Sequence, residues 1–110
     1  MLEIAFAQIE LRDICEDGKK AEQALGVVVA EALRNRIADF LAADHVTDLL
    51  VGNPQSITSD QSQIMSVDLP EQVQILFCAN HKTPPTTSAG EIDWSRVSRI
   101  KILAIGSGHV

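Results

Sequence analysis

Tyrosine is absent from this 110-residue sequence, and aromatic residues make up only 4% of it. A surface on which the bases of single-stranded nucleic acid stack is therefore hard to build. The two cysteines, Cys15 and Cys78, are too few for a disulfide-rich scaffold or a zinc ribbon. The longest wholly apolar stretches fall far short of the roughly 18 residues that a membrane-spanning helix needs. These absences point to a globular domain with no membrane segment.

Positive charge is also scarce, and it is unevenly distributed. The 9 Lys and Arg residues stand against 15 Asp and Glu residues, which gives a net charge of −6. No Lys or Arg lies between Arg36 and Lys82. Because nucleic-acid affinity comes largely from cations that displace counterions from phosphates, we expect this acidic chain to bind RNA weakly or not at all.

The remaining composition is ordinary for a globular protein, with 45% apolar and 22% charged residues. We expect residues 1–110 to form a single domain, because a chain of this length suits one domain and buries a hydrophobic core without disulfides or metals. Glu3 stands where a secretory signal peptide carries cations, so we also expect a cytoplasmic protein.

The first half of the chain predicts one strand followed by two helices. Residues 2–6 alternate between apolar and polar with a period of two, which indicates a short strand. Residues 8–16 predict a brief helix. Over residues 19–43 the apolar side chains follow the i, i+3, i+4, i+7 spacing of one long amphipathic helix. We therefore expect residues 8–43 to form an antiparallel helical pair.

Several residues refine this prediction. Asp17 is placed to cap the start of the long helix. A glycine inside a helix costs about 1 kcal/mol relative to alanine, and we interpret Gly26 as a mark of close approach by another element. Arg36 falls on the apolar side of the helix, where we expect an ion-paired structural arginine. Residues 44–50 add one further helical turn.

The second half of the chain predicts strands. The candidate strands are residues 56–59, 63–69, 73–79 and 97–105. Residues 70–72 form a turn, residues 80–90 (NHKTPPTTSAG) form a polar loop that we expect to be mobile or poorly packed, and residues 106–110 form a flexible tail. Strands that follow helices and are joined by short turns indicate an α+β fold, with an antiparallel sheet covered on one face.

Recognisable catalytic and metal-binding motifs are missing. No histidine stands in an HxxxH or CxxC-like spacing, so we expect no metal and no cofactor. Serine, histidine and aspartate occur without a frame such as GxSxG. Cys15 and Cys78 lie on predicted apolar elements and are expected to be reduced, buried thiols. We expect Trp94 to be a packing anchor.

Residues 90–105 (GEIDWSRVSRIKILAI) resemble the C-terminal segment of HigB-like toxins of the RelE/ParE superfamily. In one subgroup of these toxins a long loop ends in a Gly-x-Asp-Trp-Ser-x-Val signature before the final strand. Residues 2–6 are similar to the first strand of the group, and residues 30–39 to the end of its long helix. Residues 66–69 and 75–77 are similar to its core strands.

This resemblance implies a RelE-like α+β fold, in which an N-terminal strand and a helical hairpin pack on a small antiparallel sheet. Members are known as plasmid-maintenance killer proteins, and sometimes as killer suppression proteins. Active members cut mRNA on the ribosome. The RNA 2′-OH is the nucleophile, and acid–base groups and cations act on the scissile phosphate. The resemblance also implies a helix-turn-helix antitoxin as a protein partner.

The sequence departs from the family pattern where active members carry their chemistry. A His and an Arg of the subgroup motif His-Glu-Leu-x-Gly-Asp-Arg are replaced by glutamine, and so is the Arg of a later Tyr-Arg pair, whose Tyr becomes valine. These vestigial positions are Gln55, Gln61, Val73 and Gln74. Only Asp60 and His109 remain as weak catalytic candidates.

Glutamine hydrogen-bonds a phosphate but neither neutralises it nor carries a proton near pH 7. Losing one stabilising group at such a centre costs about 10²–10³-fold in rate, so activity is expected to be nearly abolished. We expect Gln55, Asp60, Gln61 and Gln74 to lie near His109 on one exposed face of the sheet. Alternation should point Gln74 away from the face that bears its two neighbours.

Three interpretations remain open at this point. The first is a RelE/HigB-like protein with an impaired site, which keeps the fold and binds a protein partner. The second is an active mRNA endoribonuclease toxin that uses an unusual residue set around Asp60 and His109. The third is a non-catalytic interaction module unrelated to toxin function. A neighbouring gene for an antitoxin favours the first two, and growth arrest on induced expression separates the second from the first.

Overall fold

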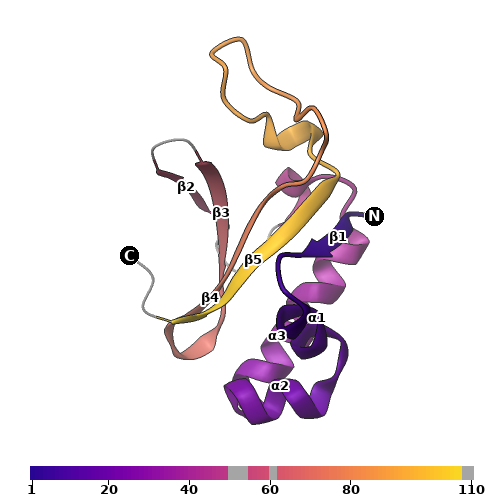
Figure 1. The fold of residues 1–110 in the computed structure, drawn as a ribbon, viewed down its shortest axis with the longest axis vertical. Coiled ribbons are helices and arrows are strands. Elements are labelled where there is room, and N and C mark those ends of the chain that lie inside the picture. The colour runs from indigo at the N-terminus through magenta and orange to yellow at the C-terminus, as the bar shows by residue number, and fades with distance from the viewer. Residues whose placement is uncertain (50–54, 60–61, 108–110) are drawn as a thin grey trace.

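The computed structural model describes residues 1–49, 55–59 and 62–107 of the chain. Within them, five strands form one sheet in the order β1-β5-β4-β3-β2, and three α-helices lie on one side of it (Figure 1). The strands are β1 (Glu3–Phe6), β2 (Gln55–Ser59), β3 (Ser62–Asp68), β4 (Val73–Ala79) and β5 (Arg99–Ser107). The helices are α1 (Ile9–Glu16), α2 (Gly18–Leu25) and α3 (Val27–Ala42), with short 3-10 helices η1 (Val46–Asp48), η2 (Pro70–Gln72) and η3 (Trp94–Arg96).

The long helix expected over residues 19–43 is instead two helices, α2 and α3, which meet at Gly26. Gly26 has φ 85° and ψ 162°, a backbone conformation that is essentially restricted to glycine. A Cβ atom built at this position would meet no atom within 4 Å, so the interpretation of Gly26 as a point of close approach is wrong. The glycine is required because the chain reverses there with a positive φ. Residues 8–43 therefore form three helices where the sequence predicted a pair.

Two polar interactions on the helices agree with the sequence. Oδ1 of Asp17 accepts hydrogen bonds from the backbone N–H groups of Lys19 at 3.0 Å and Lys20 at 3.4 Å, which caps α2. Nε of Arg36 donates to Oδ2 of Asp39 at 2.9 Å, and the arginine side chain is only 19% exposed. No helix within the described ranges has the length and apolar character required to span a membrane.

The sheet is antiparallel from β2 to β5, as predicted, but β1 pairs with β5 in parallel, with Ile4 opposite Ile100. The parallel pairing of β1 therefore corrects the prediction of an antiparallel sheet for this one strand. The apolar pattern of a short strand specifies its buried face and not its direction. Gly106 and Ser107, expected in a flexible tail, belong to β5 and pair with Gln74 and Val73. Residues 108–110 lie outside the described part of the chain.

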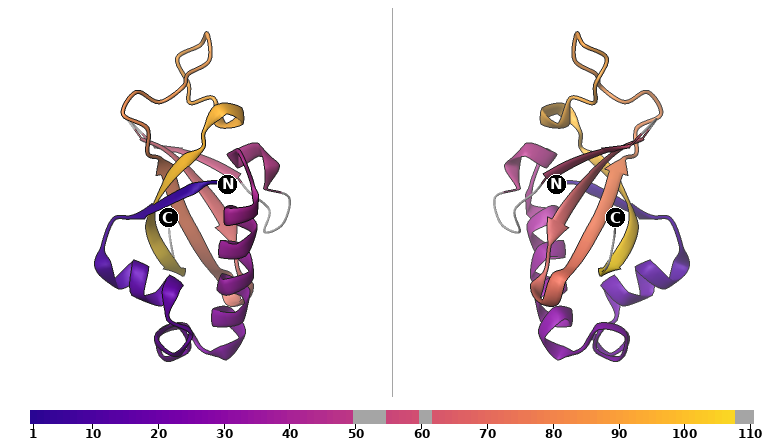
Figure 2. Two further views of the ribbon diagram at one scale, coloured as in Figure 1. Left: turned by 90° about the vertical axis from the view of Figure 1, so that its right-hand side faces the viewer. Right: turned by 90° about the vertical axis from the view of Figure 1, so that its left-hand side faces the viewer.

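The two faces of the sheet differ in what covers them. One face, here called the covered face, packs against the helices and carries the apolar core. Its main residues are Met65, Val67, Ile75, Phe77, Ile100 and Ile102, all buried. Figure 2 shows all three helices on this side of the sheet. The opposite side, here called the open face, has no described helix against it.

A β-bulge keeps the core continuous across β4 and β5. Leu76 pairs with Ala104 and the next residue, Phe77, pairs with Ile102, so Leu103 is an extra residue on β5. A bulge of this kind shifts the two-residue alternation by one position. Ile102 and Ile105 therefore both reach the covered face, although they are three positions apart in sequence and regular alternation would place them on opposite faces.

Phe77 lies at the centre of the core. Its ring makes edge-on contacts with Phe40 on α3, at a centroid distance of 5.5 Å, and with Trp94 of η3, at 6.2 Å. Trp94 is thus the packing anchor that the sequence indicated. This aromatic cluster joins the long helix, the middle of the sheet and the segment that leads into β5.

The loop over residues 80–90 projects from one end of the sheet (Figure 1). Most of its side chains are exposed, in agreement with the poor packing expected from its composition. Its outer part is closed by backbone pairing of Thr86 with Ile92 and by a hydrogen bond from the Arg96 guanidinium to the Thr86 carbonyl at 2.9 Å. The mobility expected for residues 80–90 stays a prediction.

Candidate functional site

Two of the expected site residues lie on the open face. Gln55 pairs with Ser66 across β2 and β3, and Ser66 pairs with Leu76 on β4. Gln74 is two residues from Leu76 on the same strand, so strand alternation puts Gln55 and Gln74 on one side of the sheet. The period-two pattern around Gln74 predicts this orientation from the sequence alone.

The other expected residues divide into two groups. Val73 packs against the hydrophobic core on the covered face and does not join the glutamines. This follows from its place next to Gln74, since adjacent residues of a strand point to opposite faces. Asp60, Gln61 and His109 lie outside the described residues, and their gathering with the open face stays a prediction.

Gln74 is held by a carboxylate on the neighbouring strand. Its Nε2 donates a hydrogen bond to Oδ1 of Asp68 at 3.0 Å, across a directly paired position of β3 and β4. The amide at the position that the resemblance assigns to an arginine is thus hydrogen-bonded to a carboxylate. Asp68 adds a negative charge where a phosphate-binding site needs a positive one, and it would repel an RNA backbone.

Cations on or beside the open face lie far from Gln74. Lys101 pairs with Cys78, four residues along β4 from Gln74, which is about 13 Å at roughly 3.3 Å per residue. Nε of Arg99 already pairs with Oε2 of Glu3 at 2.8 Å. Among the described residues, the end of the open face that carries Gln74 is therefore neutral to acidic.

The rest of the open face is partly apolar. Ile64, Leu76, Leu103 and Ala104 are half-buried, and none of them belongs to the core cluster. Ser66 lies among them and is only 1% exposed. Half-buried apolar groups on an uncovered sheet suit contact with another protein better than contact with a charged phosphate backbone.

The residues that carry the family resemblance have a structural role. Asp93 accepts hydrogen bonds from the backbone and hydroxyl of Ser95 and from Nε of Arg96, and so caps η3 ahead of β5. These hydrogen bonds lower the pKa of the Asp93 carboxyl. The Asp-Trp-Ser signature positions the last strand, so it can be retained whether or not the protein has activity.

Cys15 is not arranged as a nucleophile. Both Cys15 and Cys78 are free, as predicted, but they are half-buried where the sequence predicted buried thiols. Burial raises the pKa of Cys15 to about 12, and the nearby Glu16 carboxylate adds to the shift. A thiol with so high a pKa stays protonated near neutral pH and is unreactive. Within residues 1–49, 55–59 and 62–107, no group of three or more His, Cys, Asp and Glu side chains is suited to hold a metal ion.

Two features of the surface were not predicted from the sequence. The first is Asp68, whose contact with Gln74 follows from the tight turn at η2, because a turn of that length places the two residues opposite each other. Counting outward from Glu71, the middle residue of that turn, reaches Asp68 and Gln74 three positions away on either side. The second is a hollow among the three helices, which depends on the reversal at Gly26 and therefore on an element boundary that helical spacing does not show.

Comparison with known proteins adds one solved structure. No family model and no curated protein matches the chain. A chain of the YoeB–YefM complex from Staphylococcus aureus superposes with a TM-score of 0.59, with 99% of each chain covered and 12% sequence identity. At this identity the likeness establishes the fold and not the chemistry. YoeB is a toxin of the RelE family, and the present chain has the same RelE-like α+β fold.

Proposed function

We propose that this protein is a toxin–antitoxin-related protein of the HigB-like type that acts by binding a protein partner in the cytoplasm, and that it is impaired or inactive as a ribosome-dependent mRNA endonuclease. The observation that carries the proposal is the open face of a RelE-like sheet, which carries Gln55 and Gln74 and on which Gln74 is hydrogen-bonded to Asp68. The sequence resemblance assigns both glutamines to the site of active toxins.

The charges on the open face disfavour RNA cleavage. Transfer of a phosphoryl group from one RNA oxygen to another develops negative charge that active members of the family stabilise with cations. Gln55 and Gln74 supply neutral amides, and Asp68 supplies a further negative charge. Losses at groups that act as a unit are not additive, but removal of several cations together leaves little catalysis.

The fold and the open face both favour binding of a protein partner. The similar solved structure is a complex of a RelE-family toxin with YefM, its antitoxin. The open face retains half-buried apolar residues that no described helix covers. A partner that covers them gains hydrophobic stabilisation of about 25 cal/mol per Å² of apolar surface removed from water. Partner binding therefore survives the loss of the catalytic groups.

Co-expression with the product of the adjacent gene tests the proposal. We expect that product to co-purify in a stable complex, and we expect induced expression of this chain alone to leave growth unchanged. A Leu76→Glu variant places a charge on the open face at a position outside the core and should weaken a complex that uses this face. Growth arrest by the chain alone would instead support an active toxin, and the absence of any complex would support a module unrelated to toxin–antitoxin systems.

A further inference from the structure

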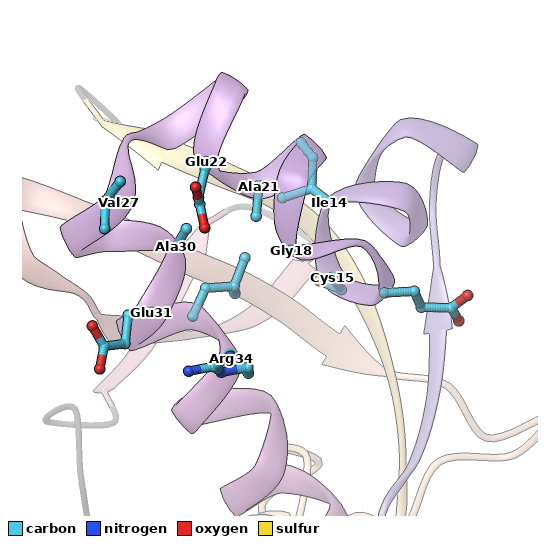
Figure 3. Close-up of a pocket in the computed structure, with 11 residues that line it drawn as sticks. Ile14, Cys15, Gly18, Ala21, Glu22, Val27, Ala30, Glu31 and Arg34 are labelled. Atoms are coloured by element: carbon cyan, nitrogen blue, oxygen red, sulfur yellow. The ribbon is translucent and has the colours of Figure 1, made fainter.

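The three helices α1, α2 and α3 enclose a hollow with an apolar lining. It has a volume of about 290 Å³ and opens between the end of α1, the length of α2 and the first turns of α3 (Figure 3). Its floor is apolar and is made by Ile14, Cys15, Ala21, Ala30 and Leu33. Pockets that enclose drug-sized ligands begin near this volume and extend to about 1,000 Å³. The hollow suits one or two apolar side chains.

The rim of the hollow is acidic. Glu16, Glu22 and Glu31 stand around it with a single cation, Arg34. Glu16 is paired with Arg12, whose Nε lies 3.1 Å from its Oε2. In the described part of the chain, Glu22, Glu31 and Arg34 form no ion pair. Two carboxylates are thus free to meet a cation from outside, on a chain whose net charge is −6.

An exposed apolar pair extends the floor onto the surface. Val27 and Val28 form the first turn of α3 and are 63% and 59% exposed. Val27 also lines the hollow. The reversal at Gly26 determines this placement, because α3 begins directly after it with its first residues pointing outward. The hollow thus combines an apolar floor, the exposed side chains of Val27 and Val28, and unpaired carboxylates at its rim. A basic, amphipathic segment is complementary to this surface in both polarity and charge.

We infer that this hollow is a docking site for a basic, amphipathic segment of the partner protein, which inserts an apolar side chain between the helices and pairs lysine or arginine with Glu22 and Glu31. The inference rests on the proposed function, which supplies the partner, and it assigns the partner's chemistry and its second contact surface. Cys15 forms part of the floor as a neutral thiol, in keeping with an apolar anchor. The site lies on the helices and is separate from the open face.

A designed peptide tests the inference without the natural partner. The probe is a fluorescent amphipathic helical peptide of leucine and lysine, with a leucine–glutamate peptide of the same length and pattern as the charge control. We expect saturable binding of the lysine peptide, followed by fluorescence anisotropy, and no binding of the glutamate peptide. Binding should weaken as ionic strength rises, because salt screens the exposed ion pairs.

Matched variants localise the binding. Glu22→Lys with Glu31→Lys should weaken lysine-peptide binding by about 10- to 100-fold, since two attractions become two repulsions. Glu10→Lys with Glu91→Lys makes the same change in net charge at exposed positions outside the hollow and should have little effect. Val27→Ser should also weaken binding, because it removes apolar contact and leaves the charges intact. Circular dichroism confirms that each variant is folded.

Two results would overturn the inference. One is equal loss of binding in the two double variants, which would show a general charge effect. The other is unchanged binding in the Glu22→Lys, Glu31→Lys variant. The same variants assayed with the co-purifying product of the adjacent gene separate the two proposals: a complex that tolerates the charge reversal refutes this docking site and leaves the proposed function intact, whereas no complex with the unmodified chain refutes the proposed function.

Discussion

Replacement of Phe77 by alanine is expected to lower the free energy of unfolding by about 3–5 kcal/mol. Phe77 has no exposed surface and contacts both Phe40 and Trp94 with the edges of its ring. Alanine would leave a cavity where the helices, the sheet and η3 meet. Because small domains are stable by only about 5–15 kcal/mol, this single change should remove a large share of the stability.

Urea denaturation followed by circular dichroism measures this loss. Val28→Ala is the control, since Val28 is 59% exposed and its truncation should change stability by no more than about 0.5 kcal/mol. A loss below about 1 kcal/mol in Phe77→Ala would contradict the central position of this ring in the core.

Replacement of Gly26 by alanine is expected to lower the free energy of unfolding by about 1–3 kcal/mol. The cause is backbone strain alone, because a Cβ atom at Gly26 meets no atom within 4 Å. The residue has φ 85°, which an L-amino acid with a side chain adopts only at a cost. The change should also disturb the start of α3, which follows directly.

Gly18→Ala is the matched control for this backbone effect. A Cβ at Gly18 likewise meets no atom within 4 Å, but Gly18 begins α2 in an ordinary helical position. Alanine there should raise stability by about 0.4–1 kcal/mol, because it restricts the unfolded chain. Thermal unfolding of the two variants should shift in opposite directions, and a shift of the same sign would contradict the conformational role of Gly26.

Local patterns predict most of the secondary structure, whereas tertiary pairing does not follow from them. Helical spacing identifies the helices but not the break at Gly26, since the apolar pattern continues across it. The alternation in residues 2–6 indicates a strand and its buried face, yet the parallel pairing of Ile4 with Ile100 depends on the route of the whole chain. The irregular spacing of Ile100, Ile102 and Ile105 has its cause in the bulge beside Leu76.

In the candidate site, too, local sequence pattern predicts side-chain orientation but not contacts between elements. The outward orientation of Gln74 follows from the polarity of one residue between two apolar ones. Its hydrogen bond to Asp68 depends on the pairing of β3 with β4, which the turn between them sets. The hollow beside Glu22 and Glu31 arises from the angle between helices, and no motif in the sequence encodes that angle.

The central claim is that a RelE-like scaffold has lost its mRNA-cleaving site, and an in vitro translation reaction with purified ribosomes tests it most directly. Cleavage of a defined mRNA is measured by primer extension with the unmodified protein, with His109→Ala, and with a variant carrying Gln55→His, Gln61→Arg and Gln74→Arg. We predict no cleavage above the protein-free control for the first two, and recovered ribosome-dependent cleavage for the third. Strong cleavage by the unmodified protein that disappears in His109→Ala would contradict the account.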